Sequence, residues 1–170
     1  MSKIAVFGSA FNPPSLGHKS VIESLAHFDH VLLVPSISHA WGKEMLDYDI
    51  RCQLVDLFIE DLSTHNVSRS EVEERLLTPN QSVTTYSVLE ALEKEFPGSE
   101  LTFVIGPDNL LKFGQFSRSE EILQRWNVLA CPEKVKVRST DIRTKLAHAS
   151  SIEGLTTQKV AILLKELSVY

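Results

Sequence analysis

The residues best suited to chemistry lie in one turn near the start of the chain, residues 8–18, which read Gly-Ser-Ala-Phe-Asn-Pro-Pro-Ser-Leu-Gly-His. A short apolar run over 4–7 precedes this turn, and apolar residues recur at helical spacing after it. A strand, a tight turn and a helix start together favour phosphate binding, because backbone N–H groups and the positive end of the helix dipole point at the turn. His18 falls in the first turn of that helix, where a donor suits the charge that builds up when a phosphoryl group is displaced. Taken alone, the turn is explained equally well by an ordinary capped helix.

Two common nucleotide-binding patterns are absent. Neither the Walker A pattern G-x-x-x-x-G-K-[ST] nor the dinucleotide fingerprint G-x-G-x-x-G occurs in the sequence. The turn is therefore neither a standard NTPase loop nor a standard nicotinamide-cofactor site. Gly8 still allows a ligand to approach the backbone closely, since it has no Cβ, and Ser15 is placed to cap the helix.

Apolar runs with strand character alternate with amphipathic helical runs along the chain. The expected strands are 4–7, 31–34, 67–72, 101–105 and 128–131, and the expected helices include 50–62, 83–96 and a run from 157 onward. Near-continuous apolar runs are typical of strands covered on both faces. The alternation predicts an α/β fold, a Rossmann-like doubly wound parallel sheet of about five strands with flanking helices, in one domain over 1–170.

In such a sheet, ligands bind outside the carboxyl ends of the strands, near the point where the strand order reverses. Polar and cationic residues follow four of the expected strands, at 8–18, 38–43, 106–109 and 138–143. Their gathering at one edge of the sheet predicts an active site there.

Composition narrows the classes of partner. The formal net charge is −5, which argues against a general nucleic-acid or membrane-surface binder, because no basic face dominates. We expect no signal peptide and no membrane span, since no segment approaches about 18 apolar residues. The two cysteines lie in apolar surroundings and are expected to be buried thiols. The six histidines show no metal-ligand spacing, so we expect no protein-held metal. With neither a signal peptide nor a membrane span expected, we expect a cytoplasmic protein.

The turn over 8–18 resembles the G-x-F-[DN]-P-x-x-x-G-H signature of the nucleotidyltransferases that carry an HxGH motif, with Ser15 in place of the first histidine. A second motif, residues 138–143, looks like the I-S-S-T-x-I-R element of the same enzymes, with Arg138 in place of the first serine. A Ser-Thr pair that opens a helix, with an arginine one turn later, is suited to holding triphosphate. Two motifs in the family's order, far apart in the sequence, make coincidence an unsatisfactory explanation.

Three looser matches point to one branch of these enzymes. Residues 106–110 resemble a G-x-D-x-L element that closes around the nucleotide ribose. Residues 82–89 are similar to an S-Y-T-x-x-T-L helix start, and 40–43 to an A-Y-G-K run. Together they resemble the nicotinate/nicotinamide mononucleotide adenylyltransferases over nearly the whole chain.

The resemblance implies direct in-line transfer of the adenylyl group of ATP to a pyridine mononucleotide, which gives the dinucleotide and pyrophosphate in NAD biosynthesis. It also implies Mg²⁺ held by the ATP phosphates and is compatible with a homo-oligomer. It assigns catalysis to His18 and Arg143. The ATP-binding residues that it implies are Gly8, Ser9, Phe11, Ser15, Gly17, His18, Gly106, Asp108, Ser139, Thr140 and Arg143, and the mononucleotide-binding ones are Trp41, Lys43, Arg51, Thr84 and Thr85.

Other readings stay open on the sequence. Pantetheine-phosphate adenylyltransferases and cytidylyltransferases share the first turn, although the 41–43 run and the 82–89 helix argue against them. A nucleotide-binding regulator without catalysis is a further alternative. Three departures from the family pattern favour this alternative: Ser15 in place of a histidine, Arg138 in place of a serine, and the short 132–137 segment before the second motif. The sequence does not choose between nicotinate and nicotinamide mononucleotide.

Overall fold

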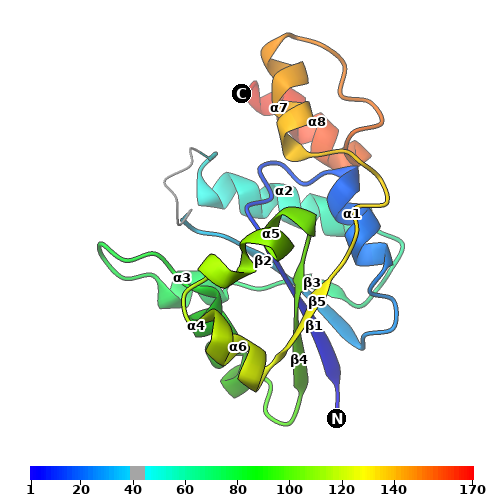
Figure 1. The fold of residues 1–170 in the computed structure, drawn as a ribbon. Coiled ribbons are helices and arrows are strands. Elements are labelled where there is room, and N and C mark those ends of the chain that lie inside the picture. The colour runs from blue at the N-terminus through cyan, green and yellow to red at the C-terminus, as the bar shows by residue number, and fades with distance from the viewer. Residues whose placement is uncertain (39–44) are drawn as a thin grey trace.

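A computed structural model describes residues 1–38 and 45–170. At its centre lies a sheet of five parallel strands in the order β3-β2-β1-β4-β5 (Figure 1). The strands are β1 (Lys3–Ser9), β2 (His30–Pro35), β3 (Val67–Arg69), β4 (Glu100–Ile105) and β5 (Asn127–Ala130). The predicted Rossmann-like, doubly wound parallel sheet is therefore confirmed.

Helices cover both faces of this sheet (Figure 1). On one face lie α1 (Leu16–Glu23), α2 (Tyr48–Glu60) and α8 (Gln158–Leu167), with α7 (Ser139–Ala147) contributing Ile142 to the same apolar cluster. On the other face lie α3 (Val72–Leu76), α4 (Thr85–Glu95), the 3₁₀ turn η1 (Phe113–Gln115) and α6 (Ser119–Arg125). The remaining helix, α5 (Pro107–Lys112), directly follows β4.

Strand β1 shows why the predicted strands are apolar at every position. Ile4 and Val6 belong to the cluster under α4 and α6, whereas Ala5 and Phe7 belong to the cluster under α1, α2 and α8. Successive side chains of a strand point to opposite faces. Because both faces are covered, both sets are buried, and the alternation of polar and apolar residues disappears.

The strand order reverses between β1 and β4. Val6 pairs with Leu32 of β2 on one side and with Phe103 of β4 on the other. The chain first builds outward from β1 to β3, then returns to start β4 on the opposite side of β1. The loops that leave β1 and β4 therefore diverge at their carboxyl ends, and this divergence opens a crevice for ligands.

Two expected elements differ in the structure. The strand expected over 67–72 ends at Arg69, and Val72 instead begins α3, where it is fully buried against the sheet. Buried apolar residues occur in both strands and helices, so the apolar character of Val72 did not show which of the two it belongs to. The apolar spacing after the first turn, at Val21, Ile22, Leu25 and Phe28, predicts one continuous helix. In the structure α1 ends at Glu23, and Leu25 and Phe28 are buried from the turns that follow it. The expected helices over 50–62, 83–96 and from 157 are confirmed as α2, α4 and α8.

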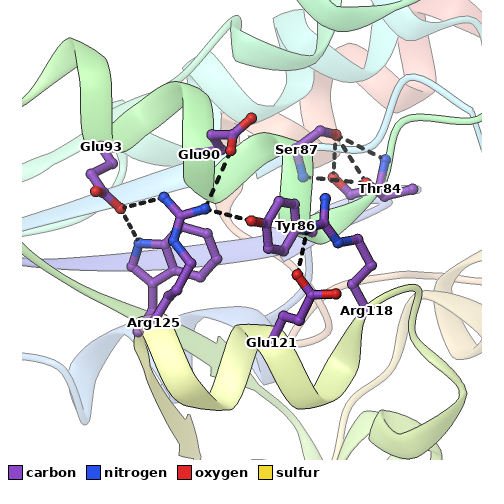
Figure 2. A network of polar contacts seen from close by, with 9 residues as sticks. Thr84, Tyr86, Ser87, Glu90, Glu93, Arg118, Glu121 and Arg125 are labelled. Atoms are coloured by element: carbon purple, nitrogen blue, oxygen red, sulfur yellow. Dashed lines mark hydrogen bonds and ion pairs between the residues drawn. The ribbon is translucent and has the colours of Figure 1, made fainter.

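A polar network on the solvent side ties α6 to α4 (Figure 2). The Arg125 guanidinium donates to the Tyr86 hydroxyl at 2.5 Å and to the Glu90 carboxylate at 3.2 Å. The Trp126 indole N–H donates to Glu93 at 2.7 Å, also across the two elements. The same helix α4 is capped at its start, where the Thr84 side chain accepts from the backbone N–H of Ser87. These contacts hold the N-terminus of α4 in place beside the crevice.

Candidate active site

A pocket of about 560 Å³ occupies the crevice at the carboxyl ends of the strands. Segments that follow β1, β2, β4 and β5 supply its walls, together with the segment before α4. It is lined by many of the residues that the sequence predicted for the site: Gly8, Ser9, Ser15, Gly17, His18, Thr84, Thr85, Gly106, Asp108 and Ser139. The expectation that polar residues gather at one edge of the sheet is thus met by the described residues.

Four predicted site residues do not line this pocket, namely Phe11, Arg51, Thr140 and Arg143. Two others, Trp41 and Lys43, lie outside the described residues, so their assignment to the mononucleotide stays a prediction.

Ser15 and His18 form a reciprocal cap at the start of α1. The Ser15 hydroxyl accepts from the backbone N–H of His18 at 3.3 Å, and the backbone N–H of Ser15 donates to His18 Nδ1 at 3.0 Å. An Nδ1 that accepts a hydrogen bond carries no proton, so the neutral imidazole holds its proton on Nε2. Nε2 lies 3.1 Å from Ser9 Oγ, beside the pocket. The imidazole is thus oriented as a donor toward the crevice.

The same surroundings keep His18 uncharged. Its ring packs against Phe11 and Phe7, with centroid separations of 4.8 and 5.9 Å. Burial lowers the pKa of His18 to about 4, because desolvation disfavours the charged form. Phe11 is itself fully buried, so the structure gives it a packing role behind the histidine.

The segment before α7 docks onto the turn at 8–18. Gly17 lies so close to Val137 that an added Cβ would stand 2.1 Å from the Val137 carbonyl oxygen. The Ser15 hydroxyl donates to that carbonyl at 3.2 Å, and the Ser139 hydroxyl donates to the Pro13 carbonyl at 2.6 Å. The N-terminal ends of α1 and α7 consequently line the same pocket. Both ends favour anions through the positive ends of their dipoles.

Arg143 binds the turn from the next turn of α7. Its guanidinium donates to the Asn12 carbonyl at 2.7 Å and to the Thr140 hydroxyl at 3.0 Å. The side chain is half-buried and lies beside the pocket wall. These contacts bring the two predicted motifs together.

Arg51 takes a different position from the one expected. It is 1% exposed, and its guanidinium donates to the carbonyls of Leu46, Ala10 and Ser36 at 2.8, 2.8 and 2.6 Å. Burial lowers the pKa of Arg51. The side chain joins three loop segments beneath the pocket, so its contacts indicate a scaffold for the loops after β1 and β2.

The structure adds acidic residues that the sequence motifs did not single out. Glu73 is buried in the pocket wall and accepts from the backbone N–H of Ile37 at 3.1 Å. Burial raises the pKa of Glu73 to about 7, against the opposing effects of that N–H and of Arg51. Glu133 also lines the pocket. Glu73 follows the carboxyl end of β3, and Glu133 follows that of β5. These positions in the sequence could have marked both residues as candidates for the site.

Comparison with known proteins agrees with this geometry. A family model described as cytidylyltransferase-like matches residues 6–152. The chain belongs to the cytidylyltransferase-like family. It is therefore a nucleotidyltransferase with the fold of that family, and the predicted resemblance to HxGH-type enzymes is confirmed at this level.

Several relatives of this nucleotidyltransferase carry a more specific description. A solved structure from Vibrio parahaemolyticus, provisionally described as a nicotinate-nucleotide adenylyltransferase, is 55% identical, has a TM-score of 0.89, and is matched over 99% of this chain and 94% of its own. A probable nicotinate-nucleotide adenylyltransferase from Anaeromyxobacter sp. (strain K) is 25% identical over 99% of this chain and 96% of its own length. The Plasmodium falciparum nicotinic acid mononucleotide adenylyltransferase complexed with NaAD has a TM-score of 0.81 at 13% identity, over 100% of this chain and 98% of its own, which shows a shared fold.

No helix among the described residues is long and apolar enough to cross a bilayer.

Proposed function

We propose that this nucleotidyltransferase transfers the adenylyl group of ATP to nicotinate mononucleotide, or to its nicotinamide counterpart, and releases the dinucleotide and pyrophosphate. The observation that carries the proposal is the corner where α1 and α7 begin. There a neutral, oriented His18 donor and two helix N-termini line one pocket of about 560 Å³. That volume lies within the roughly 300–1,000 Å³ common for small-molecule sites. The descriptions of the Vibrio and Anaeromyxobacter relatives support the choice of substrate.

The proposed reaction is a single in-line displacement. A phosphate oxygen of the mononucleotide attacks the α-phosphorus of ATP, and the bond from that phosphorus to the bridging oxygen of the β-phosphate breaks. Pyrophosphate leaves with the electron pair, and no covalent intermediate with the protein forms. The His18 Nε2–H donates to a non-bridging α-phosphate oxygen, where charge builds up in the transition state. The chain thus acts by positioning and electrostatics.

The pyridine end of the substrate is placed beside α4. Thr84 caps that helix and Thr85 is its first residue, and both line the pocket. Their hydroxyls and the free N–H groups of the helix start suit a carboxylate or a carboxamide. Trp41 and Lys43 remain predictions for the same subsite.

Magnesium is proposed to arrive with the nucleotide. Among the described residues, no three His, Cys, Asp or Glu side chains gather as a metal site. We therefore propose that the ATP phosphates supply most of the ligands of Mg²⁺, as they commonly do. When bound, the ion neutralises phosphate charge. A single domain over 1–170, a cytoplasmic location and a homo-oligomeric state also remain predictions.

The decisive experiment is a substrate panel. The protein is incubated with ATP, Mg²⁺ and either nicotinate or nicotinamide mononucleotide, and both dinucleotide and pyrophosphate are measured. We expect dinucleotide and pyrophosphate in equal amounts with at least one mononucleotide. Phosphopantetheine with ATP, and CTP with a phosphorylated alcohol, serve as controls for the other branches of the family.

Two results would reject the proposal. Product from a control substrate alone would place the chain in another branch. ATP binding without pyrophosphate release from any substrate would indicate a nucleotide-binding regulator.

A further inference from the structure

The charges around the pocket are unbalanced. Among the described residues that line it, the carboxylates are Glu73, Asp108 and Glu133, and Arg138 is the single Lys or Arg. His18 contributes no positive charge near neutral pH, because burial lowers its pKa to about 4. A nucleoside triphosphate is a polyanion. Among the described residues that line the pocket, Arg138 is the one cationic side chain that can stabilise it.

Arg138 stands at a favourable place for that role. It is the N-cap of the nine-residue helix α7, whose dipole attracts anions, and its own backbone N–H donates to the Asp141 carboxylate at 2.9 Å. Its guanidinium contacts two carboxylates that also line the pocket: Nη1 lies 2.6 Å from Asp108 Oδ2, and Nε lies 3.4 Å from Glu133 Oε2. In the I-S-S-T-x-I-R element of similar enzymes a serine occupies this position, so the cation is a feature of this chain.

We propose that Arg138 is a triphosphate-binding residue, whose guanidinium moves from Asp108 and Glu133 to oxygens of the β- and γ-phosphates at the start of α7. The inference rests on the proposed function in taking ATP as the substrate. The movement also releases the Asp108 carboxylate, which can then accept from the ribose hydroxyls of the same nucleotide. One side chain thereby couples the phosphate end of the site to the ribose end.

The energetics favour this exchange of partners. The Arg138 and Asp108 side chains are 53% and 62% exposed, and such ion pairs contribute little to stability because water screens them. An arginine that donates two parallel hydrogen bonds to a phosphate makes a stronger, charge-assisted contact. Arg138 already donates two hydrogen bonds to Asp108, at 2.6 and 3.5 Å, so the exchange depends on the larger negative charge of the β- and γ-phosphates.

The test compares Arg138→Ser, Arg138→Lys and a matched control, Arg75→Ser. Serine restores the residue of the family motif and is a favoured N-cap, so α7 is expected to stay folded. Arg75 is a suitable control because its pair with Glu95 is also 2.6 Å long and exposed, and it does not line the pocket. Calorimetry gives the Kd for ATP and for AMP, and steady-state kinetics gives the KM for ATP and for the mononucleotide.

We expect Arg138→Ser to raise the Kd and the KM for ATP by about tenfold or more, the effect of losing a charged hydrogen bond. The Kd for AMP should not rise, because AMP carries no β- and γ-phosphates and the variant leaves Asp108 free to accept from its ribose hydroxyls. The KM for the mononucleotide should stay near that of the unaltered protein, because that molecule also lacks these phosphates. Arg138→Lys should lie in between, since an ammonium supplies charge without the two-pronged geometry. Arg75→Ser should bind ATP normally.

Three outcomes would overturn the assignment: unchanged or tighter ATP binding by Arg138→Ser, an equal loss of affinity for ATP and AMP, or an equal loss in Arg75→Ser. Failure of the proposed function is distinguishable from these outcomes. In that case the unaltered protein makes no dinucleotide, whereas the comparison of ATP with AMP binding still tests Arg138.

Discussion

His18 is set up as a neutral hydrogen-bond donor because its neighbours fix both its charge and its tautomer. The backbone N–H of Ser15 occupies Nδ1, and the rings of Phe7 and Phe11 pack against the imidazole. The serine that replaces the first histidine of the family motif therefore still serves the second one. It caps α1, and its backbone orients the His18 ring.

Replacing His18 tests the donor directly. His18→Ala is expected to lower kcat by roughly a hundredfold, the usual effect of removing one donor to developing charge. His18→Gln should recover part of the rate, because its amide can donate. The rates are measured with saturating ATP and mononucleotide, and His65→Ala, at an exposed position, is the control. Near-normal turnover of His18→Ala would show that another group stabilises the α-phosphate.

The lowered pKa of His18 also predicts a pH dependence of stability. The pKa is about 4 in the folded protein and about 6.5 in the unfolded chain, so between these values the unfolded chain binds more protons. This contribution to stability is complete above pH 6.5 and is lost as the pH falls toward 4. Urea unfolding at pH 7.5 and pH 4.5 should show a larger loss for the unaltered protein than for His18→Gln. Glu73, with its raised pKa, has the opposite dependence in both proteins.

If the free energy of unfolding falls equally in the unaltered protein and in His18→Gln between pH 7.5 and pH 4.5, this account of His18 is wrong.

At the scale of elements, the active-site corner depends on how closely α1 meets the segment before α7. Gly17 allows the Val137 carbonyl to approach the first turn of α1, and Ser15 donates to the same carbonyl. The short 132–137 segment thus has a defined docking position on the turn. The short segment was one reason to consider a non-catalytic protein. It nevertheless allows the two motifs to contact each other.

Gly17→Ala should therefore separate these elements. A Cβ at 2.1 Å from the Val137 oxygen forces the backbone to move. We expect a loss of about 1–3 kcal/mol in the free energy of unfolding, as for other overpacking changes, and a fall in turnover because α7 is displaced. Gly114→Ala is the control, since a Cβ there meets nothing within 4 Å. Equal stability and turnover in the two variants would refute the contact.

At the scale of the whole molecule, the last part of the chain closes over the first turn. The Thr156 hydroxyl donates to the Pro14 carbonyl at 2.8 Å, and the Tyr170 hydroxyl donates to Asn12 Oδ1 at 2.5 Å. Asn12 is 3% exposed, and its carbonyl accepts from Arg143. Residues from opposite ends of the sequence therefore hold the 8–18 turn in one conformation.

Tyr170→Phe tests that closure. Loss of the hydroxyl should lower the free energy of unfolding by about 1 kcal/mol and reduce kcat more than it changes KM, because Asn12 supports the turn and not the substrate. Tyr86→Phe is the matched control, since its hydroxyl accepts from Arg125 at the same 2.5 Å distance but between α4 and α6 (Figure 2). It should lose stability with little change in kcat. A similar kcat in both variants would show that Tyr170 has no positioning role.

The sequence by itself determined the parallel sheet, the strand ends that carry the site and the two motifs around His18 and Ser139. Apolar runs and helical spacing are local patterns, and they survive into the fold because buried strands and amphipathic helices require them. Tertiary structure decided which polar side chains face the pocket. Arg51 was predicted to bind the mononucleotide, yet its guanidinium donates to three backbone carbonyls. Glu73 carried no motif, yet it lies in the wall. The positions of Arg51 and Glu73 depend on contacts between loops that are distant in the sequence. Local residue spacing does not predict such contacts.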